Sequence, residues 1–382
     1  MLYKRFTGTK QQAHFCLKQS LLALCLILFC TQSKTASAQM LSQGLNIQFL
    51  GDLSLQYPHS KSIPASFVLG DVDIWFQHSF GENLNAIGEL LIMNEEGGEG
   101  DTYNINPARL FIEYSISEKL KLRLGQLHTA IGLYSQLYPH GGSIFEPSLH
   151  RPLLAGVKEG EDILPFHALG FNLRGTSMIG DHLEFMYIVG ISNGYSHGSM
   201  DTNQQKAPYF QLRLSPLDIM GLTFAFSAYH DLVTKDEIKD GIEQTIMALS
   251  IMYDAFPFDI LAEGFVMRNA STPPDSFKFF GPSDPDEITL PDGRQPRKQL
   301  FGGYLQASYM FGAKHAVFTV LEAFQRDKGD YLFDEHTPYT KYYGTELGHR
   351  FHWNQNLVLK SAYNYNWADD LHRFDIQLAF KI

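Results

Sequence analysis

Two alternations along the chain, one in its side chains and one in the lengths of its connections, constrain the fold most. About sixteen segments alternate apolar and polar residues with period two, as β-strands with one apolar face do. No long helical periodicity competes with this pattern. The candidate strands lie near residues 44–57, 67–79, 83–94, 107–117, 119–130, 168–177, 182–193, 207–215, 220–230, 244–254, 258–269, 301–311, 315–326, 341–353, 356–367 and 372–382.

The connections between these segments are alternately short and long. The short ones carry turn residues such as Gly, Asn and Asp, as at 81–83, 180–182 and 312–314. Short turns on one rim and long loops on the other are typical of a transmembrane barrel, and a β-sandwich has no reason for them. We therefore expect an all-β fold, a transmembrane antiparallel β-barrel of about 16 strands with short periplasmic turns and long extracellular loops. The long polar connections fall near 58–66, 95–106, 131–167, 194–206, 231–243, 270–300 and 327–340, and the short connection 368–371 is the exception.

The last segment shows the side-chain pattern most clearly. One face carries Arg373, Asp375 and Lys381, and a strand of this length can cross a bilayer with water on that face and lipid on the other. The opposite face is wholly apolar, with Phe374, Ile376, Leu378, Phe380 and Ile382.

Aromatic residues near the expected strand ends fit the girdles that barrels place at the membrane interfaces. The alternative is the ordinary enrichment of strands in aromatic residues, so the girdle supports a barrel only together with the connection lengths. The residues concerned are Trp75, Phe76, Phe80, Tyr209, Phe210, Phe256, Phe258, Phe311, Tyr342, Tyr343, Phe351, Trp353 and Trp367.

The first 38 residues have the anatomy of a secretory signal peptide. A basic region without acids precedes an apolar run at 21–29, and the small residues at 36–38 suit cleavage before Gln39. All three cysteines fall within this leader, so the mature chain 39–382 has none. A zinc–thiolate site and a cysteine nucleophile are therefore excluded, and we expect export to the bacterial outer membrane.

The net charge of the chain argues against another class of partner. The chain has 30 Lys+Arg and 41 Asp+Glu, and the leader takes away five bases and no acids, which leaves a net charge of −16. Nucleic-acid phosphates need basic patches, so no nucleic-acid partner is expected. After the leader the sequence has no run of 18 apolar residues that could form a membrane-spanning helix.

The pattern as a whole resembles Gram-negative outer-membrane porins. The segment 122–126, Leu-Arg-Leu-Gly-Gln, followed by Thr-Ala-Ile-Gly at 129–132, looks like the arginine–glycine–glutamine segment of phosphate-selective-type porins. That family's proline and phenylalanine before the last glycine are missing here. The resemblance also implies that Phe380 and Ile382 belong to the signal read by the barrel-assembly machinery. Outer-membrane lipid is a further expected partner, and assembly as a homotrimer is left open.

The resemblance makes 131–167 the long loop that folds into the lumen and narrows it. Loops longer than about 15 residues are usually functional or disordered, so a solvated surface loop is the alternative. We expect a constriction between the acids of this loop and bases on neighbouring strands. The expected lining residues are Glu146, Glu159, Glu161 and Asp162 from the loop, and Arg109, Lys121, Arg123 and Arg174 from the wall.

These observations predict a porin that passes small hydrophilic solutes or ions by passive diffusion, with weak charge selectivity rather than strong phosphate binding. The alternative is an outer-membrane enzyme of lipase or protease type on a smaller barrel of about ten or twelve strands. A plugged transporter would need a domain before the first strand, and only about five residues separate it from the cleavage site. A secreted soluble sandwich is a third option.

No cofactor, catalytic residue or metal site is predicted. The fifteen His residues are scattered, and the nearest group is His140, His150 and His167 in one loop. Metal binding there is weaker as an interpretation than simple solvation. The acidic run 283–287 could offer carboxylates to Ca²⁺ but is read as a solvated loop.

Overall fold

The computed structural model describes residues 44–58, 64–95, 102–138, 140–155, 163–194, 205–233, 241–271, 297–330 and 332–382. Residues 47–382 form one compact unit, and the description below concerns that unit. The predicted signal peptide, 1–38, and the acidic run 283–287 lie outside the described residues. No helix among the described residues is long and apolar enough to cross a membrane.

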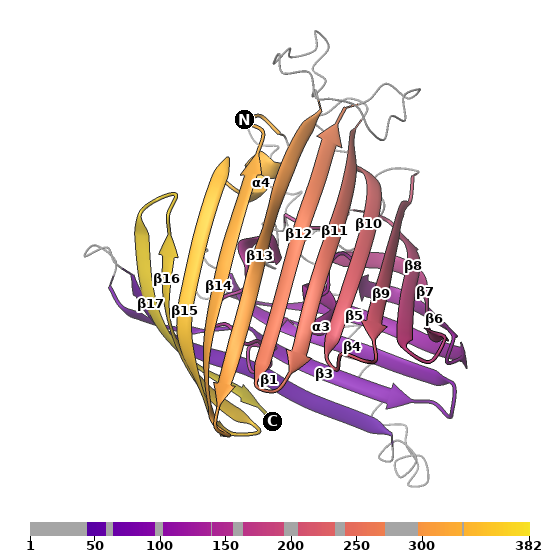
Figure 1. Cartoon of the computed structure of the whole chain (residues 1–382), viewed down its shortest axis with the longest axis horizontal. Helices are drawn as coiled ribbons and strands as arrows, with labels where there is room; N and C mark the ends of the chain where they lie inside the picture. The colour runs from indigo at the N-terminus through magenta and orange to yellow at the C-terminus, as the bar shows by residue number, and fades with distance from the viewer. Residues whose placement is uncertain are drawn as a thin grey trace, which may run out of the picture. The chain divides into compact units, whose positions relative to one another are not determined.

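Strands make up most of the unit, and Figure 1 shows them side by side. The strands are β1 (Leu45–Pro58), β2 (Ser66–Leu69), β3 (Val72–Ser79), β4 (Leu84–Glu95), β5 (Thr102–Ser117), β6 (Leu120–His128), β7 (His167–Ile179), β8 (Leu183–Ser192), β9 (Ala207–Pro216), β10 (Leu222–Val233), β11 (Ile242–Ala255), β12 (Phe258–Ala270), β13 (Lys298–Phe311), β14 (His315–Arg326), β15 (Lys341–Asn354), β16 (Leu357–Asn366) and β17 (Leu371–Lys381). Three short helical segments complete the list, α3 (Tyr134–Leu137), η1 (Leu153–Ala155) and α4 (Phe333–His336).

The strands form a single closed antiparallel sheet in which neighbours in the chain are neighbours in the sheet. β2 and β3 both pair with β1 and are separated only by Gly70 and Asp71, so they are two parts of one barrel strand. The barrel therefore has sixteen strands, and the predicted fold class and strand count are confirmed.

β17 closes the barrel against β1. Their register places Leu50 opposite Lys381 and Pro58 opposite Arg373. Phe49 and Ile382 exchange two backbone hydrogen bonds of 2.8 Å each, so pairing continues to the last residue. Closure of this kind leaves no edge strand with unpaired backbone groups, which a strand in lipid cannot tolerate.

The connections alternate in length as the sequence predicts. Tight turns join β3 to β4, β5 to β6, β7 to β8, β9 to β10, β11 to β12, β13 to β14 and β15 to β16. Gly180 and Gly312 turn with φ of +61° and +72°, a backbone region that glycine enters without a side-chain clash. The other connections are long, apart from the short turn between β16 and β17 that the sequence also indicates.

The two faces of each strand differ in the predicted way. On β17, Phe374 and Leu378 are exposed on the outer face, whereas Asp375 and Gln377 are buried inside the barrel. Many large apolar side chains are likewise exposed on the outside, which suits contact with lipid.

The expected aromatic girdle is partly wrong. Trp353, Trp367 and Phe256 are exposed, at 63%, 61% and 78%. Trp75, however, faces the lumen, because it shares the face of Asp73 two residues before it and lies beneath the Arg109 guanidinium. Tyr209 is also internal, at 3% exposure, within the apolar cluster described below.

Candidate pore constriction

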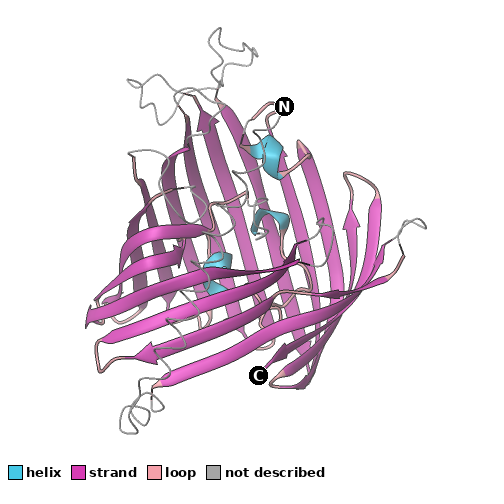
Figure 2. Cartoon of the chain, turned by 180° about the vertical axis from the view of Figure 1, so that it is seen from behind, coloured by secondary structure: helices cyan, strands magenta, loops and turns pink. Residues whose placement is uncertain are grey.

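The long connection between β6 and β7 includes the described segments 129–138, 140–155 and 163–166. These segments lie against the inner wall of the barrel, and we call them the inner loop. Figure 2 shows helical turns within the ring of strands. Leu133 and Leu154 of this loop are fully buried, and Tyr134 is 1% exposed. They belong to an apolar cluster with inward residues of the wall, Ile188, Ala207, Tyr209, Ala225, Tyr229, Ile246, Ala248, Leu261, Phe265, Met267, Leu300, Tyr304 and Phe324.

This apolar patch on β8–β14 explains why the loop lies inside rather than over the rim. Burying apolar side chains from water contributes roughly 25 cal/mol per Å², so a loop with Leu133 and Leu154 gains by covering the patch. A lumen lined throughout by polar residues would offer no such contact. The inner loop thus occupies one side of the lumen.

Four buried glutamates of the wall, which we call the anchoring glutamates, accept hydrogen bonds from backbone N–H groups of the inner loop. Glu89 on β4 accepts from His140 at 2.9 Å. Glu263 on β12 accepts from Leu133 and Tyr134, Glu322 on β14 from Leu153 and Leu154, and Glu346 on β15 from Leu149 and His150. A loop without regular structure leaves backbone donors unpaired, and a carboxylate is a strong acceptor for them.

Two bases of the wall bind carbonyl groups of the same loop. Arg350 on β15 donates to the carbonyls of Ile144 and Glu146, at 2.6 and 3.2 Å. Lys360 on β16, fully buried, donates to the carbonyls of Ser143 and Ser148. In all, hydrogen bonds or ion pairs join the loop to β1, β4, β6, β7, β9, β10 and β12–β17.

His150 joins the loop to the wall through two ion pairs, and we call this contact the His150 fastening. Its Nδ1 lies 2.5 Å from a carboxylate oxygen of Glu346, and its Nε2 lies 2.8 Å from one of Asp375 on β17. Burial by itself would lower the pKa of His150, but the two carboxylates outweigh it and raise the pKa above its ordinary value. The imidazole is therefore held as a cation bridging two strands.

The predicted loop acids are only partly described. Glu146 is 2% exposed, and its carboxylate pairs with Arg151 of the same loop at 2.5 Å. Arg151 also donates to the carbonyl of His140 at 2.8 Å. The Glu146 carboxylate therefore holds two parts of the loop together through Arg151. Glu159, Glu161 and Asp162 lie outside the described residues.

The predicted bases are brought together on β5–β7, and we call them the basic arc: Arg109, Lys121, Arg123 and Arg174. Two of them have wall partners, since Arg109 pairs with Glu89, and Arg123 lies 2.6 Å from Glu113. Lys121 is 3.8 Å from Glu113 and directly opposite Arg174 in the sheet register.

Arg213 on β9 continues the basic arc, although the predicted constriction does not include it. Its Nε donates to Gln211 at 2.7 Å, and Arg174 contacts the sulfur of Met186 at 3.8 Å. Strand parity alone marks Arg213 as inward, and its place beside the arc depends on the order of β7, β8 and β9 in the sheet.

The anchoring glutamates are a further set that the sequence does not single out, apart from the inward position of Glu89. Parity identifies them as inward, but only the path of the loop shows what they bind. The anchoring glutamates bind backbone N–H groups of the loop. The charged side chains that face the lumen at β5–β7 are therefore mainly cationic. Charged side chains act strongly in a narrow, low-dielectric passage.

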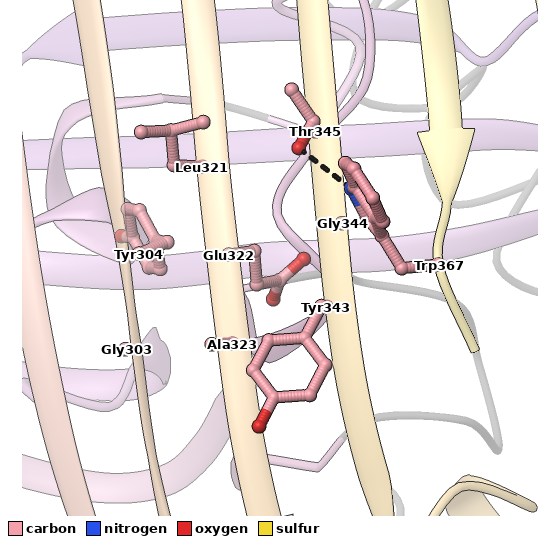
Figure 3. Close-up of a pocket in the computed structure, with 9 residues that line it drawn as sticks. All are labelled: Gly303, Tyr304, Leu321, Glu322, Ala323, Tyr343, Gly344, Thr345 and Trp367. Atoms are coloured by element: carbon pink, nitrogen blue, oxygen red, sulfur yellow. Dashed lines mark hydrogen bonds between the residues drawn. The ribbon is translucent and has the colours of Figure 1, made fainter.

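A separate hollow of about 550 Å³ lies at β13–β15 (Figure 3). Leu321, Tyr343 and Trp367, which line it, are exposed on the outer face, and Trp367 donates to the Thr345 hydroxyl at 3.1 Å. Gly303, on the outward face, leaves space there because it has no side chain. This hollow therefore differs from the constriction in facing outward.

No protein-family model matches the chain, and no curated protein matches it significantly in sequence. Solved structures with similar folds are outer-membrane channels. An anion-selective porin from Comamonas acidovorans is 12% identical with a TM-score of 0.56, and the match covers 88% of this chain and 98% of that one. Salmonella typhi OmpF in complex with daunomycin is 10% identical with a TM-score of 0.56, covering 88% and 97%. A trimer form of OmpT, an outer-membrane protein of Vibrio cholerae, is 10% identical with a TM-score of 0.54, covering 88% and 99%.

These likenesses show a shared fold, the sixteen-stranded barrel of general porins. They do not single out a phosphate-selective type. A smaller barrel of ten or twelve strands, on which the alternative of an outer-membrane enzyme rests, is not the barrel found here.

Proposed function

We propose that this chain is an outer-membrane porin that passes small hydrophilic solutes by passive diffusion. The observation that carries the proposal is the inner loop, which is fastened inside a closed barrel to β1, β4, β9, β10 and β12–β17. Most of the hydrogen bonds and ion pairs that fasten it come from wall strands other than β5–β7. Its contacts with β6 and β7 are at His128 and His167, where the loop leaves the wall. The diffusion path runs between the inner loop and the basic arc.

The solute meets the basic arc at this narrowing. Arg109 and Arg123 are balanced in part by Glu89 and Glu113, whereas Arg174 and Arg213 face uncharged partners. We infer weak charge selectivity, in which the arc offsets the net negative charge of the mature chain and favours small anions locally. Assignment to the phosphate-selective type is the finer proposal, supported by the resemblance at 122–132, and competition of chloride current by phosphate would test it.

Export and assembly follow from the two ends of the sequence. The leader 1–38 directs export, and Phe380 and Ile382 complete the strand that closes on β1 and serve as the assembly signal. The Phe380 ring covers Gly51 of β1, where an added Cβ would come within 2.9 Å of it. Removal of 380–382 should leave the chain unassembled in the periplasm, and a normal heat-modifiable barrel in the outer membrane would contradict this role.

Assembly as a homotrimer is the proposed oligomeric state, supported by the trimer form of Vibrio cholerae OmpT. Native mass spectrometry from mild detergent tests it, and a monomer at all concentrations would contradict it.

Planar-bilayer recording of the refolded protein tests the proposed function. We expect stepwise insertion of ohmic channels and, in a salt gradient, a reversal potential close to zero. A folded, inserted barrel that gives no conductance steps would refute diffusion through this lumen. Boiling the sample before insertion is the control, because it unfolds the barrel without changing the sequence.

A further inference from the structure

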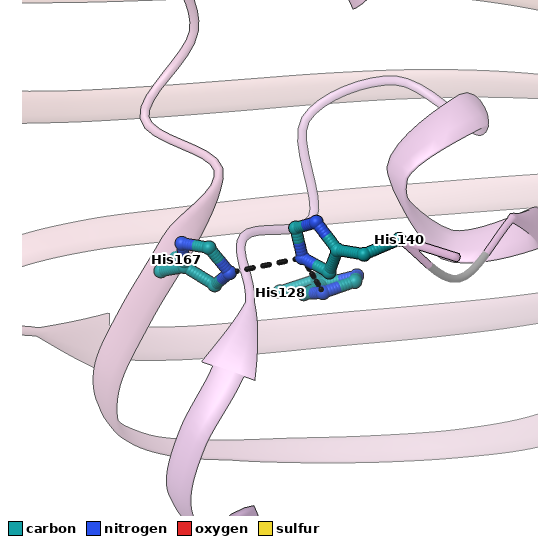
Figure 4. Close-up of side chains that lie close together, drawn as sticks. All are labelled: His128, His140 and His167. Carbon is teal, nitrogen blue, oxygen red and sulfur yellow. Dashed lines mark hydrogen bonds between the residues drawn. The ribbon is translucent and has the colours of Figure 1, made fainter. Parts of the chain in front are cut away.

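Three histidine rings meet where the inner loop leaves the wall (Figure 4). His128 ends β6, His167 begins β7 directly opposite it, and His140 comes from the middle of the loop. The Nε2 atom of His140 lies 3.2 Å from Nε2 of His128 and 3.0 Å from Nε2 of His167. His128 and His140 are each 5% exposed, and His167 is half-buried.

The protonation of His128 follows from its other nitrogen. Its Nδ1 lies 2.7 Å from the carbonyl oxygen of Ser135, which can only accept, so Nδ1 carries the proton. In the neutral ring Nε2 then presents a lone pair towards the centre of the group. A histidine that donates its second nitrogen to a carbonyl is the usual arrangement of a metal ligand, because that bond fixes the tautomer and the ring orientation.

The three rings cannot satisfy one another by hydrogen bonding alone. Nε2 of His140 holds either one hydrogen or one lone pair, yet it faces two ring nitrogens. If it donates to His167, it offers no hydrogen to the Nε2 lone pair of His128. If it accepts from His167, its lone pair faces the lone pair of His128. A cation at the centre would accept all three lone pairs together.

The spacing fits a transition metal. In tetrahedral zinc sites the metal–nitrogen bond is about 2.0–2.1 Å, which places ligand nitrogens about 3.3 Å apart. The separations of 3.2 and 3.0 Å need only a small outward shift to reach this value.

Glu89 and Phe166 lie next to the histidine rings. Glu89 accepts the backbone N–H of His140 through Oε1, and its Oε2 lies 3.9 Å from Nε2 of His128. The Phe166 ring packs edge-to-face against the rings of His128 and His140, and its centroid lies 4.5 and 5.0 Å from theirs. Glu89 also pairs with Arg109, so its carboxylate serves here to position the His140 backbone, and the phenyl ring shields one side from water.

We propose that His128, His140 and His167 bind one divalent transition-metal ion of the zinc class through their Nε2 atoms. Water takes the fourth position, on the half-buried His167 side. The ion joins both ends of the inner loop to its middle and so pins the loop to the wall. Because two of its three ligands are buried, the ion is structural and does not travel along the diffusion path.

His150 does not belong to this group, although the sequence places it with His140 and His167 in one loop. It is held by Glu346 and Asp375 on the far side of the loop. His128 takes its place, because the antiparallel pairing of β6 with β7 brings residue 128 beside residue 167.

Metal binding is measured directly on the refolded mature chain, purified without a polyhistidine tag and stripped with a chelator. Titration with ZnCl₂ at about pH 7.5, where histidine is neutral, should give one ion per chain. His140→Ala should weaken binding by about 100-fold or more, since even the hydrogen-bond partners of metal ligands are worth 10- to 100-fold. Co²⁺ should give the visible absorption of a four-coordinate site in the wild type and lose it in this variant.

The matched control removes another pair of histidines. His315 and His349 lie 3.1 Å apart on exposed strand surface and could bind zinc weakly, so His315→Ala/His349→Ala should leave the tight site intact. If the His140 variant fails to fold, His167→Ala makes the same prediction. Equal zinc affinity in the wild type and the folded His140 or His167 variant would overturn the proposal, and so would a site lost only in the control. Conduction is not the readout, so these outcomes are independent of the proposed porin function.

Discussion

The wall strands β5–β7 and β12–β15 belong to one barrel and follow the same inward parity, yet they meet different partners. On β12–β15 the inward acids Glu263, Glu322 and Glu346 accept backbone N–H groups of the inner loop. On β5–β7 the inward groups are mainly the bases Arg109 and Arg174 with their neighbours, and they bind wall carboxylates or uncharged groups.

The difference shows how the sign of a charge can direct a loop. An irregular segment inside a barrel has unpaired N–H donors, and leaving a buried one unsatisfied costs about 1–3 kcal/mol. Carboxylates satisfy these donors, and guanidinium groups cannot. The loop therefore lies where these carboxylates and the apolar patch are, and Arg350 and Lys360 hold its carbonyl groups there. The bases of the basic arc are left facing the path.

Removing the loop should give the largest effect. Replacing 140–155 by a short Gly-Ser linker removes the fastenings to β14–β17 and to β4, so the narrowing should be lost. We expect single-channel conductance to rise about twofold or more. An unchanged conductance in a folded barrel would mean that this loop does not limit the passage.

Loss of one anchoring glutamate should loosen the loop without removing it. Glu263→Gln weakens an acceptor that serves Leu133, Tyr134 and the hydroxyls of Ser250 and Tyr304. A cost of about 1–3 kcal/mol would raise the detached fraction of the loop about 5- to 150-fold, seen as current fluctuations.

The matched control for that variant is Glu113→Gln on the basic arc. Glu113 is a buried inward glutamate too, but it binds Arg123 and not the loop. Equal current noise from the two variants would contradict the assignment of Glu263 as an anchor.

The His150 fastening should depend on pH. Since its folded-state pKa is raised, the fastening contributes fully below the ordinary histidine value of about 6.5 and is lost as the pH rises through the raised value. Loop fluctuations should therefore increase with alkaline pH in the wild type. In His150→Gln they should be present at every pH, and a wild-type-like pH profile in this variant would exclude the imidazolium as the cause.

Changes in the basic arc should give the smallest effect, in selectivity alone. Arg123→Ala/Arg174→Ala should shift the reversal potential towards cations, with about a twofold change in the permeability ratio. Arg350→Ala, which removes a base that holds loop carbonyls, should alter current noise more than selectivity. If Arg350→Ala changed selectivity more than noise, and Arg123→Ala/Arg174→Ala changed noise more than selectivity, the roles assigned to the two regions would be wrong.

The fold could be predicted almost entirely from the sequence, because its determinants are local. Strand parity and turn glycines such as Gly180 and Gly312 depend on neighbours in the chain. The inward bases and the existence of an inner loop could also be predicted from the sequence. Trp75 shows the limit, because its face follows from parity with Asp73 but a girdle position was assigned from its residue type.

The site could not be predicted in the same way, because it depends on the path of one long irregular segment. Which glutamate binds which N–H, and that His150 lies between Glu346 and Asp375, are long-range facts. One signal was available in the sequence. Inward positions such as Ile246 and Met267 are apolar near the long-loop rim, which indicates that something covers them.

The central claim is that the inner loop covers one side of the lumen and leaves the basic arc open to solute. The chain has no cysteine after residue 30, so single cysteines can be placed on each side of the lumen without background from the barrel. Lys121 of the arc is 35% exposed in its side chain, whereas Gln306 on β13 is 1% exposed and hydrogen-bonded to Ser148 of the loop. During bilayer recording, a bulky hydrophilic thiol reagent should react with Lys121→Cys and reduce its current, and should leave Gln306→Cys unchanged. Equal reaction of both, or faster reaction of Gln306→Cys, would contradict the account.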